Sequence, residues 1–133
     1  IVQYTSKRLP ETILSWMKSG RAISFSYSPD GKKVAVEYVS AGIRVYDLEY
    51  GVIYDFGEGE APVWQDNENL IYMVVKDDGH DIQDGNLFQR KYDGSYPVAL
   101  TGKIDIPAFY PAAHGKTLFF SDLQGSIYKI ILN

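Results

Sequence analysis

One acidic segment of the sequence gathers side chains that bind cations. Residues 76–86 read KDDGHDIQDGN. Hard cations such as Ca²⁺ are held by several carboxylate and carbonyl oxygens, so a calcium site is one interpretation. The spacing does not match an EF-hand loop, in which acidic residues alternate and a glycine stands sixth. The interpretation we favour is a solvated connection in which Gly79 and Gly85 form turns, and we therefore expect no cofactor.

The same segment is the longest insertion that the sequence predicts. Long loops on a rigid scaffold often carry binding residues, so its polar side chains are candidates for contact with a ligand or partner. Trp16 is the aromatic residue that we most expect at an interface, because it has no counterpart in the repeats described below. The candidate binding residues are Asp77, Asp78, His80, Asp81, Asp84 and Trp16.

No catalytic arrangement stands out. The chain has no cysteine, which excludes disulfides, thiolate metal sites and a cysteine nucleophile. His80 and His114 are the only histidines, and they lack the paired spacing of a zinc site. A G-x-S-x-G elbow is absent, and the glycine-rich stretch 56–62 (FGEGEAP) lacks the lysine and following helix of a phosphate-binding loop. We predict no catalytic residue and no metal ligand.

Composition narrows the possible partners. The chain has 133 residues, enough for one domain, and a formal charge of −4, which argues against binding to nucleic acid. Its longest apolar run, residues 70–75, is far shorter than the roughly 20 residues that span a bilayer. We therefore expect no nucleic acid partner and no membrane span; the expected partner, a protein or a second copy of the chain, follows from the fold discussed below.

The elements that would position such residues are short strands. Ser28-Pro29-Asp30-Gly31 predicts a turn, because proline presets its own φ and glycine accepts the positive φ that often follows. Alternating apolar residues then predict strands over 34–39, 43–48 and 52–56. The pattern is typical of an antiparallel meander.

The order of aromatic residue, polar turn and apolar strand occurs three times. Tyr27, Trp64 and Phe109 fall at matching places in the three repeats, 37 and 45 residues apart. A period near 40 residues with several strands in each unit is typical of β-propeller blades. We expect Trp64 and Phe109 to lie in the core.

The residues of the first repeat, Ser28-Pro29-Asp30-Gly31-Lys32-Lys33 with Val34-Ala35-Val36 after them, resemble the repeat of the TolB-like β-propellers. They also resemble the propeller domains of prolyl-oligopeptidase-type peptidases. Residues 96–102 (YPVALTG) resemble the outer strand that ends such a blade. The second and third repeats depart from the turn motif. The TolB-like resemblance implies a periplasmic or extracellular setting and a protein partner.

The predicted fold is all-β, a β-propeller segment of four-stranded antiparallel blades in which one chain does not close the ring. Residues 1–133 form a single segment of about three blades. Residues 1–20 supply the end strands of a preceding blade, 21–60 and 61–105 form two blades, and 106–133 form a partial blade. A competing prediction makes residues 10–18 a short helix. Because each blade packs between neighbours, we expect a fragment of a larger propeller or a ring closed by a second copy.

Three functions remain open at this stage. The leading one is a non-catalytic scaffold that binds a protein partner. The second is the gating propeller of a serine peptidase whose catalytic domain lies elsewhere. The third is a carbohydrate-binding or lyase propeller that uses the loop from Asp77 to Asp84.

Overall fold

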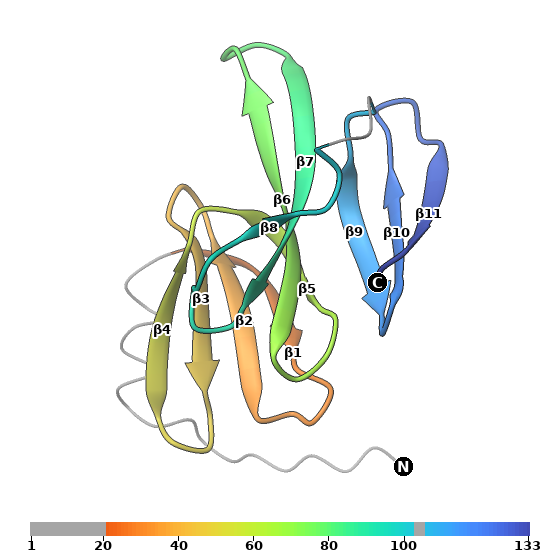
Figure 1. Cartoon of the computed structure of the whole chain (residues 1–133). Helices are drawn as coiled ribbons and strands as arrows, with labels where there is room; N and C mark the ends of the chain where they lie inside the picture. The colour runs from red at the N-terminus through yellow and green to blue at the C-terminus, as the bar shows by residue number, and fades with distance from the viewer. Residues whose placement is uncertain (1–20, 103–105) are drawn as a thin grey trace, which may run out of the picture.

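The computed structural model describes residues 21–102 and 106–133, and within them it is built from strands alone (Figure 1). The all-β prediction is therefore confirmed for these residues. Trp16, the expected strands within 1–20 and the alternative helix over 10–18 lie outside them. The described residues contain no helix with the length and apolarity that crossing a membrane requires.

Three antiparallel sheets follow one another along the chain. In all three sheets, strands that are consecutive in the chain pair with each other. The first sheet contains β1 (Ala22–Tyr27), β2 (Lys33–Tyr38), β3 (Gly42–Asp47) and β4 (Val52–Gly57). The second contains β5 (Glu60–Trp64), β6 (Asn69–Asp77), β7 (Ile82–Lys91) and β8 (Val98–Ala99). The third contains β9 (Phe109–His114), β10 (Thr117–Ser121) and β11 (Ile127–Ile131).

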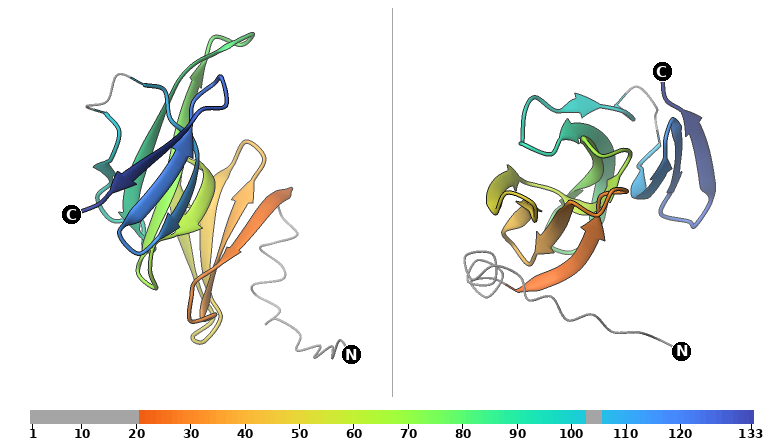
Figure 2. Two further views of the ribbon diagram at one scale, coloured as in Figure 1. Left: turned by 90° about the vertical axis from the view of Figure 1, so that its right-hand side faces the viewer. Right: turned by 90° about the horizontal axis from the view of Figure 1, so that it is seen from below.

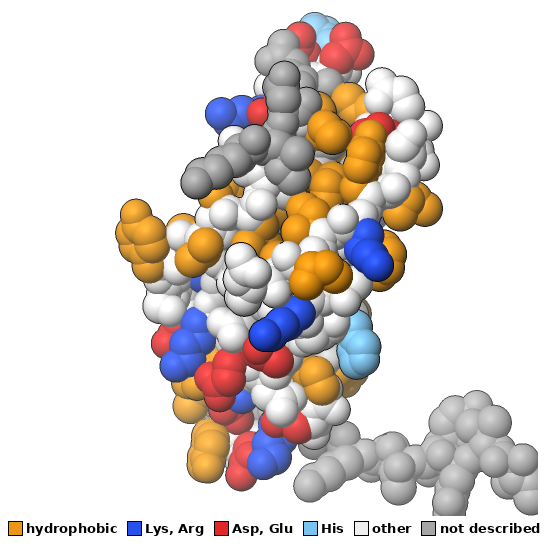
Figure 3. All heavy atoms as spheres, turned by 45° about the vertical axis from the view of Figure 1, so that its right-hand side comes forward, with side chains coloured by type: hydrophobic (Ala, Val, Ile, Leu, Met, Phe, Trp, Pro, Cys, Tyr) orange, Lys and Arg blue, Asp and Glu red, His pale blue; other side chains and the backbone are white. Residues whose placement is uncertain are grey.

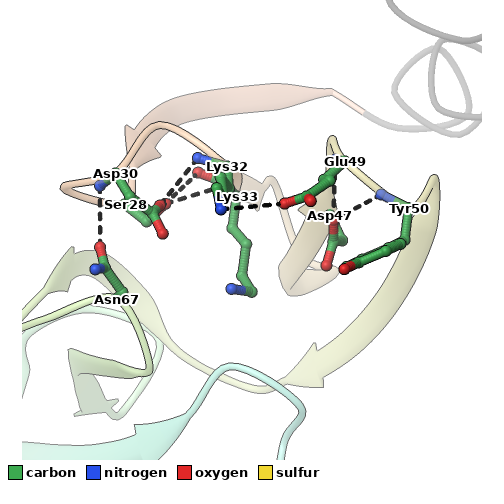
Figure 4. A network of polar contacts seen from close by, with 8 residues as sticks. All are labelled: Ser28, Asp30, Lys32, Lys33, Asp47, Glu49, Tyr50 and Asn67. Carbon is green, nitrogen blue, oxygen red and sulfur yellow. Dashed lines mark hydrogen bonds and ion pairs between the residues drawn. The ribbon is translucent and has the colours of Figure 1, made fainter.

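The turn between β1 and β2 forms as its sequence predicts. Gly31 has a φ of +72°, which favours glycine. The Asp30 carboxylate accepts hydrogen bonds from the Ser28 hydroxyl (2.7 Å) and the Lys32 backbone N–H (3.0 Å). The Asp30 N–H in turn donates to Asn67 Oδ1 in the turn between β5 and β6 (Figure 4). This turn therefore also links the first sheet to the second.

Each sheet packs on the next through an apolar core. Between the first and second sheets, Val45 and Phe56 lie against Trp64 and Tyr72. Between the second and third sheets, Ile71, Met73 and Leu87 meet a second set, namely Phe109, Leu118 and Phe120. The first strands of neighbouring sheets lie against each other: β5 contacts β1, and β9 contacts β5. The views in Figure 2 show the three sheets side by side in chain order.

The predicted repeat alignment is correct for two of its aromatic residues and wrong for the third. Tyr27 and Trp64 both end the first strand of their sheets, and they pair with Val34 and Leu70 respectively. Phe109 begins β9 instead, opposite Ser121. Burial differs as well, because Trp64 is 6% exposed and Tyr27 61% exposed. Trp64 and Phe109 are both buried, so their predicted place in the core is confirmed.

Candidate functional site

The acidic segment 76–86 is a hairpin rather than a long loop. Asp77 ends β6 and pairs with Ile82, the first residue of β7, so the connection is residues 78–81 alone. Asp84 lies on β7 opposite Lys76. The prediction of a long inserted loop is therefore wrong. Backbone pairing between β6 and β7 therefore accounts for most of residues 76–86.

The carboxylates of this hairpin accept hydrogen bonds from nearby backbone N–H groups. Asp78 Oδ1 accepts from the backbone N–H groups of His80 (2.9 Å) and Asp81 (2.8 Å), and Asp77 Oδ1 accepts from Gly79 (3.0 Å). The bonds to Asp78 hold the pKa of its carboxyl below the ordinary value. In the described part of the chain no group of three or more His, Asp or Glu side chains is arranged to hold a metal ion. These contacts fit the turn-forming interpretation of the segment.

The two histidines are not brought together. His80 is exposed in the turn between β6 and β7, whereas His114 is the last residue of β9. Phe109, at the other end of β9, is the residue that lies near the hairpin, since it lines a hollow together with Asp77. His114 is five residues further along the strand, or about 17 Å at the usual rise. The two imidazoles therefore do not form a joint site.

Two hollows meet at the same end of the three sheets and form what we call the acidic groove. The larger, about 680 Å³, lies between the first and second sheets, and the smaller, about 360 Å³, lies between the second and third. They share Glu60, Met73 and Val75. Apolar side chains in the lining include Ile23, Tyr38, Met73, Val75, Phe109 and Leu123. The carboxylates in the lining are Glu37, Asp55, Glu58, Glu60, Asp77 and Asp122.

The charged side chains in the lining of the acidic groove are carboxylates. Among the described residues that line either hollow, none is a lysine or arginine. Burial, followed by the neighbouring charges of Glu37 and Asp77, raises the pKa of Glu60. Burial and the neighbouring carboxylates both disfavour the charged form of Glu60, and a cation bound nearby would favour it.

Glu37 fixes one wall of the acidic groove. Its Oε1 accepts hydrogen bonds from the Ala61 N–H (2.9 Å) and the Ser24 hydroxyl (3.2 Å), so it joins β1, β2 and the start of β5. Ala61 has a φ of +50°, a conformation that residues other than glycine rarely adopt. The bond from Glu37 holds Ala61, and with it the neighbouring Glu60, in place.

Asp122 closes the groove at the third sheet. It accepts hydrogen bonds from the N–H groups of Gln124 (3.0 Å) and Ser126 (2.9 Å), and from the Tyr128 hydroxyl (3.0 Å). Partial desolvation works to raise its pKa, but these bonds outweigh it and the pKa is lowered. Asp122 therefore keeps its negative charge at neutral pH.

Of the candidate residues that the structure describes, only Asp77 lines the acidic groove. Asp78, His80 and Asp81 lie in the hairpin turn, Asp84 lies on β7, and none of these four lines either hollow. The other five carboxylates of the lining were not predicted from the sequence. One signal was available in residues 56–62, where Glu58 and Glu60 alternate with glycines ahead of a proline.

The chain was compared with known families and proteins. No family model matches it. No curated protein matches it either. The geometry of the groove therefore carries the functional argument.

Proposed function

We propose that this chain is part of a non-catalytic β-propeller scaffold that binds a protein partner in the acidic groove. Two four-stranded antiparallel sheets in chain order, each packed on the next with its first strand alongside that of its neighbour, support the propeller arrangement. The TolB-like resemblance of the first repeat supports it further. The third sheet would be a further blade, of which the described residues form three strands.

The observation that carries the binding proposal is the lining of the acidic groove. Its two hollows extend across all three sheets, which suits an extended polypeptide better than a compact small molecule. Apolar side chains provide contact area, and six carboxylates, of which Asp55 lies opposite Arg44 on β3, provide the charge pattern. Charge complementarity of this kind sets specificity and association rate. The partner segment that fits carries lysine or arginine side chains between apolar ones.

The test uses a fluorescein-labelled peptide of alternating lysine and leucine, followed by fluorescence anisotropy. We expect binding that weakens as ionic strength rises, because salt screens exposed charge pairs. The double substitution Glu58→Gln with Glu60→Gln should weaken binding about fivefold, since an exposed ion pair contributes about 0.2–1 kcal/mol. An alternating glutamate and leucine peptide should not bind.

The matched control is the double substitution Glu49→Gln with Glu68→Gln, which also removes two charges, from the turns that follow β3 and β5, away from the groove. Binding should be unchanged in this variant. Equal weakening by the control and the groove variants would mean that the peptide responds only to net charge, and would exclude the groove as the site. Binding of the acidic peptide would also contradict the proposal.

A further inference from the structure

The smaller hollow of the acidic groove combines an apolar floor with carboxylates. Its floor contains buried and half-buried apolar side chains, namely Met73, Val75 and Phe109. Its carboxylates are those of Glu60, Asp77 and Asp122. Figure 3 brings the side of the third sheet forward and shows hydrophobic side chains below the acidic tip of the β6–β7 hairpin. A hollow of about 360 Å³ lies near the lower end of the range for ligand pockets, so it suits one long side chain with an apolar stem and a charged head.

The three carboxylates of this hollow come from different elements and accept hydrogen bonds from neutral donors. Glu60 begins β5, Asp77 ends β6, and Asp122 lies in the turn after β10. Asp77 accepts a bond from one backbone N–H, and Asp122 accepts from two N–H groups and a tyrosine hydroxyl. Neither ion pair found among the described residues includes any of the three. Their negative charge is therefore not neutralised by a lysine or arginine in the described part of the chain.

A cation larger than a metal ion fits this arrangement. Within the described ranges no three acidic or histidine side chains are arranged to hold a metal, although three carboxylates line this one hollow. A planar guanidinium carries five N–H donors and can bond carboxylates on more than one side, whereas an ammonium has three donors on one nitrogen. A guanidinium is also more weakly hydrated than an ammonium, so less hydration is lost when it enters the hollow. Arginine therefore fits better than lysine.

Tyr110 adds an aromatic surface at the same hollow. It is the second residue of β9, lines the hollow and is 68% exposed. Its φ of +52° is rare for a bulky residue, and its backbone N–H donates to Met73 Sδ (3.4 Å), which holds the strand start against the floor of the hollow. Guanidinium groups stack on aromatic rings as well as bonding carboxylates. An exposed tyrosine beside three carboxylates therefore favours arginine as well.

From this lining we infer that the smaller hollow receives one arginine side chain of the partner segment, with its stem on Met73 and Val75 and its guanidinium at the carboxylates of Asp77 and Asp122. The inference rests on the proposed function, because the partner segment must lie in the acidic groove. It goes further by naming the side chain that anchors the segment and the hollow that selects it. The remaining basic side chains of the segment need only general charge complementarity.

The test compares three fluorescein-labelled peptides of alternating lysine and leucine by fluorescence anisotropy. The first has lysine at its centre, the second has arginine there, and the third has citrulline, which has the shape of arginine without its charge. We expect the arginine peptide to bind about fivefold more tightly than the lysine peptide, because a guanidinium gains stacking and a second hydrogen bond that an ammonium lacks. The citrulline peptide should bind most weakly.

Two variants of the protein assign the preference to the smaller hollow. Asp77 and Asp122 line that hollow only, so Asp77→Asn and Asp122→Asn should each reduce the arginine preference to less than about twofold, with folding checked by circular dichroism. The matched control is Glu58→Gln, since Glu58 lines the larger hollow only. This control should weaken the arginine and lysine peptides alike and leave the ratio of their affinities unchanged.

The outcomes separate this inference from the proposed function. Equal binding of the arginine and lysine peptides to the unmodified protein would overturn the inference and leave the proposed function standing. A preference that persisted in both Asp77→Asn and Asp122→Asn, or that was lost to the same extent in Glu58→Gln, would overturn the assignment to the smaller hollow. Failure of all three peptides to bind would contradict the proposed function and the inference with it.

Discussion

The indole Nε1 of Trp64 donates a 2.7 Å hydrogen bond to the backbone carbonyl oxygen of Ser26. Trp64 is the last residue of β5 and Ser26 lies on β1, so this bond joins the first strands of two neighbouring sheets. The indole ring is buried in the core between the sheets. One side chain therefore contributes both packing and a directional contact at the sheet junction.

Replacing Trp64 by phenylalanine should destabilise the fold. The smaller ring leaves a cavity and removes the donor to Ser26, which together should lower the free energy of unfolding by about 2 kcal/mol. Urea denaturation followed by circular dichroism measures this. Tyr27→Phe is the control at the matching strand position, where the exposed ring should make the change smaller than about 0.5 kcal/mol. Equal losses at the two positions would contradict the packing difference described above.

Gly85→Ala tests the contact between the second and third sheets. A Cβ atom at Gly85 would overlap the Phe109 ring and lie 2.8 Å from the Ala108 carbonyl oxygen, so the strands would have to separate. Overpacking of this kind should lower the free energy of unfolding by about 1–3 kcal/mol, measured by urea denaturation. Gly102→Ala is the control, because its Cβ would have only an ordinary contact, 3.8 Å from Ala99. Unchanged stability of Gly85→Ala would mean that β9 does not pack on β7 this closely.

Local turn chemistry made much of the fold predictable. Residue type and alternation predict the Ser28-to-Gly31 turn, the strands after it, and the buried positions of Trp64 and Phe109. The alignment of the third repeat failed because a buried aromatic residue can begin a strand as readily as end one. The position of Phe109 at the start of β9, opposite Ser121, follows from the strand pairing and not from local sequence.

The candidate site was less predictable because it is assembled across sheets. Glu37, Glu60 and Asp122 come from three different sheets or their turns and are far apart in the sequence. Four acids lie close together in the sequence of residues 76–86, but in the hairpin Asp77 and Asp78 accept hydrogen bonds from nearby backbone N–H groups. The groove is defined by carboxylates that meet in space, and not by the composition of any one segment.

The raised pKa of Glu60 predicts how stability depends on pH. Because burial and the charges of Glu37 and Asp77 raise the pKa in the folded state, folding is favoured while Glu60 is protonated, and that contribution is lost as pH rises through the folded-state pKa. Glu60→Gln should therefore melt at a higher temperature than the unmodified protein at neutral pH. The advantage should disappear below about pH 4, the range of an unfolded glutamate. Thermal melts at both pH values measure this.

Glu68→Gln is the control for that experiment. Glu68 is paired with Lys91 (3.8 Å) on the surface and faces no groove carboxylate, so its replacement should not raise the melting temperature at neutral pH. If Glu60→Gln melted no higher than the unmodified protein at neutral pH, the electrostatic description of the groove would be wrong.

Asp30 should have the opposite pH dependence. The Lys32 N–H bond, followed by the Ser28 hydroxyl bond, lowers its pKa in the folded state, so the ionised carboxylate stabilises the turn. That contribution is present above the unfolded pKa and is lost as pH falls through the lower folded pKa. Asp30→Ala should therefore lower the melting temperature at neutral pH, and the difference should shrink toward about pH 2. Asp30→Asn keeps an acceptor oxygen without the charge, so its loss should be smaller than that of Asp30→Ala and should also shrink as pH falls. A loss in Asp30→Ala that stayed constant down to the lowest pH would assign the effect to the shape of the turn alone, and not to the charge that Lys32 and Ser28 stabilise.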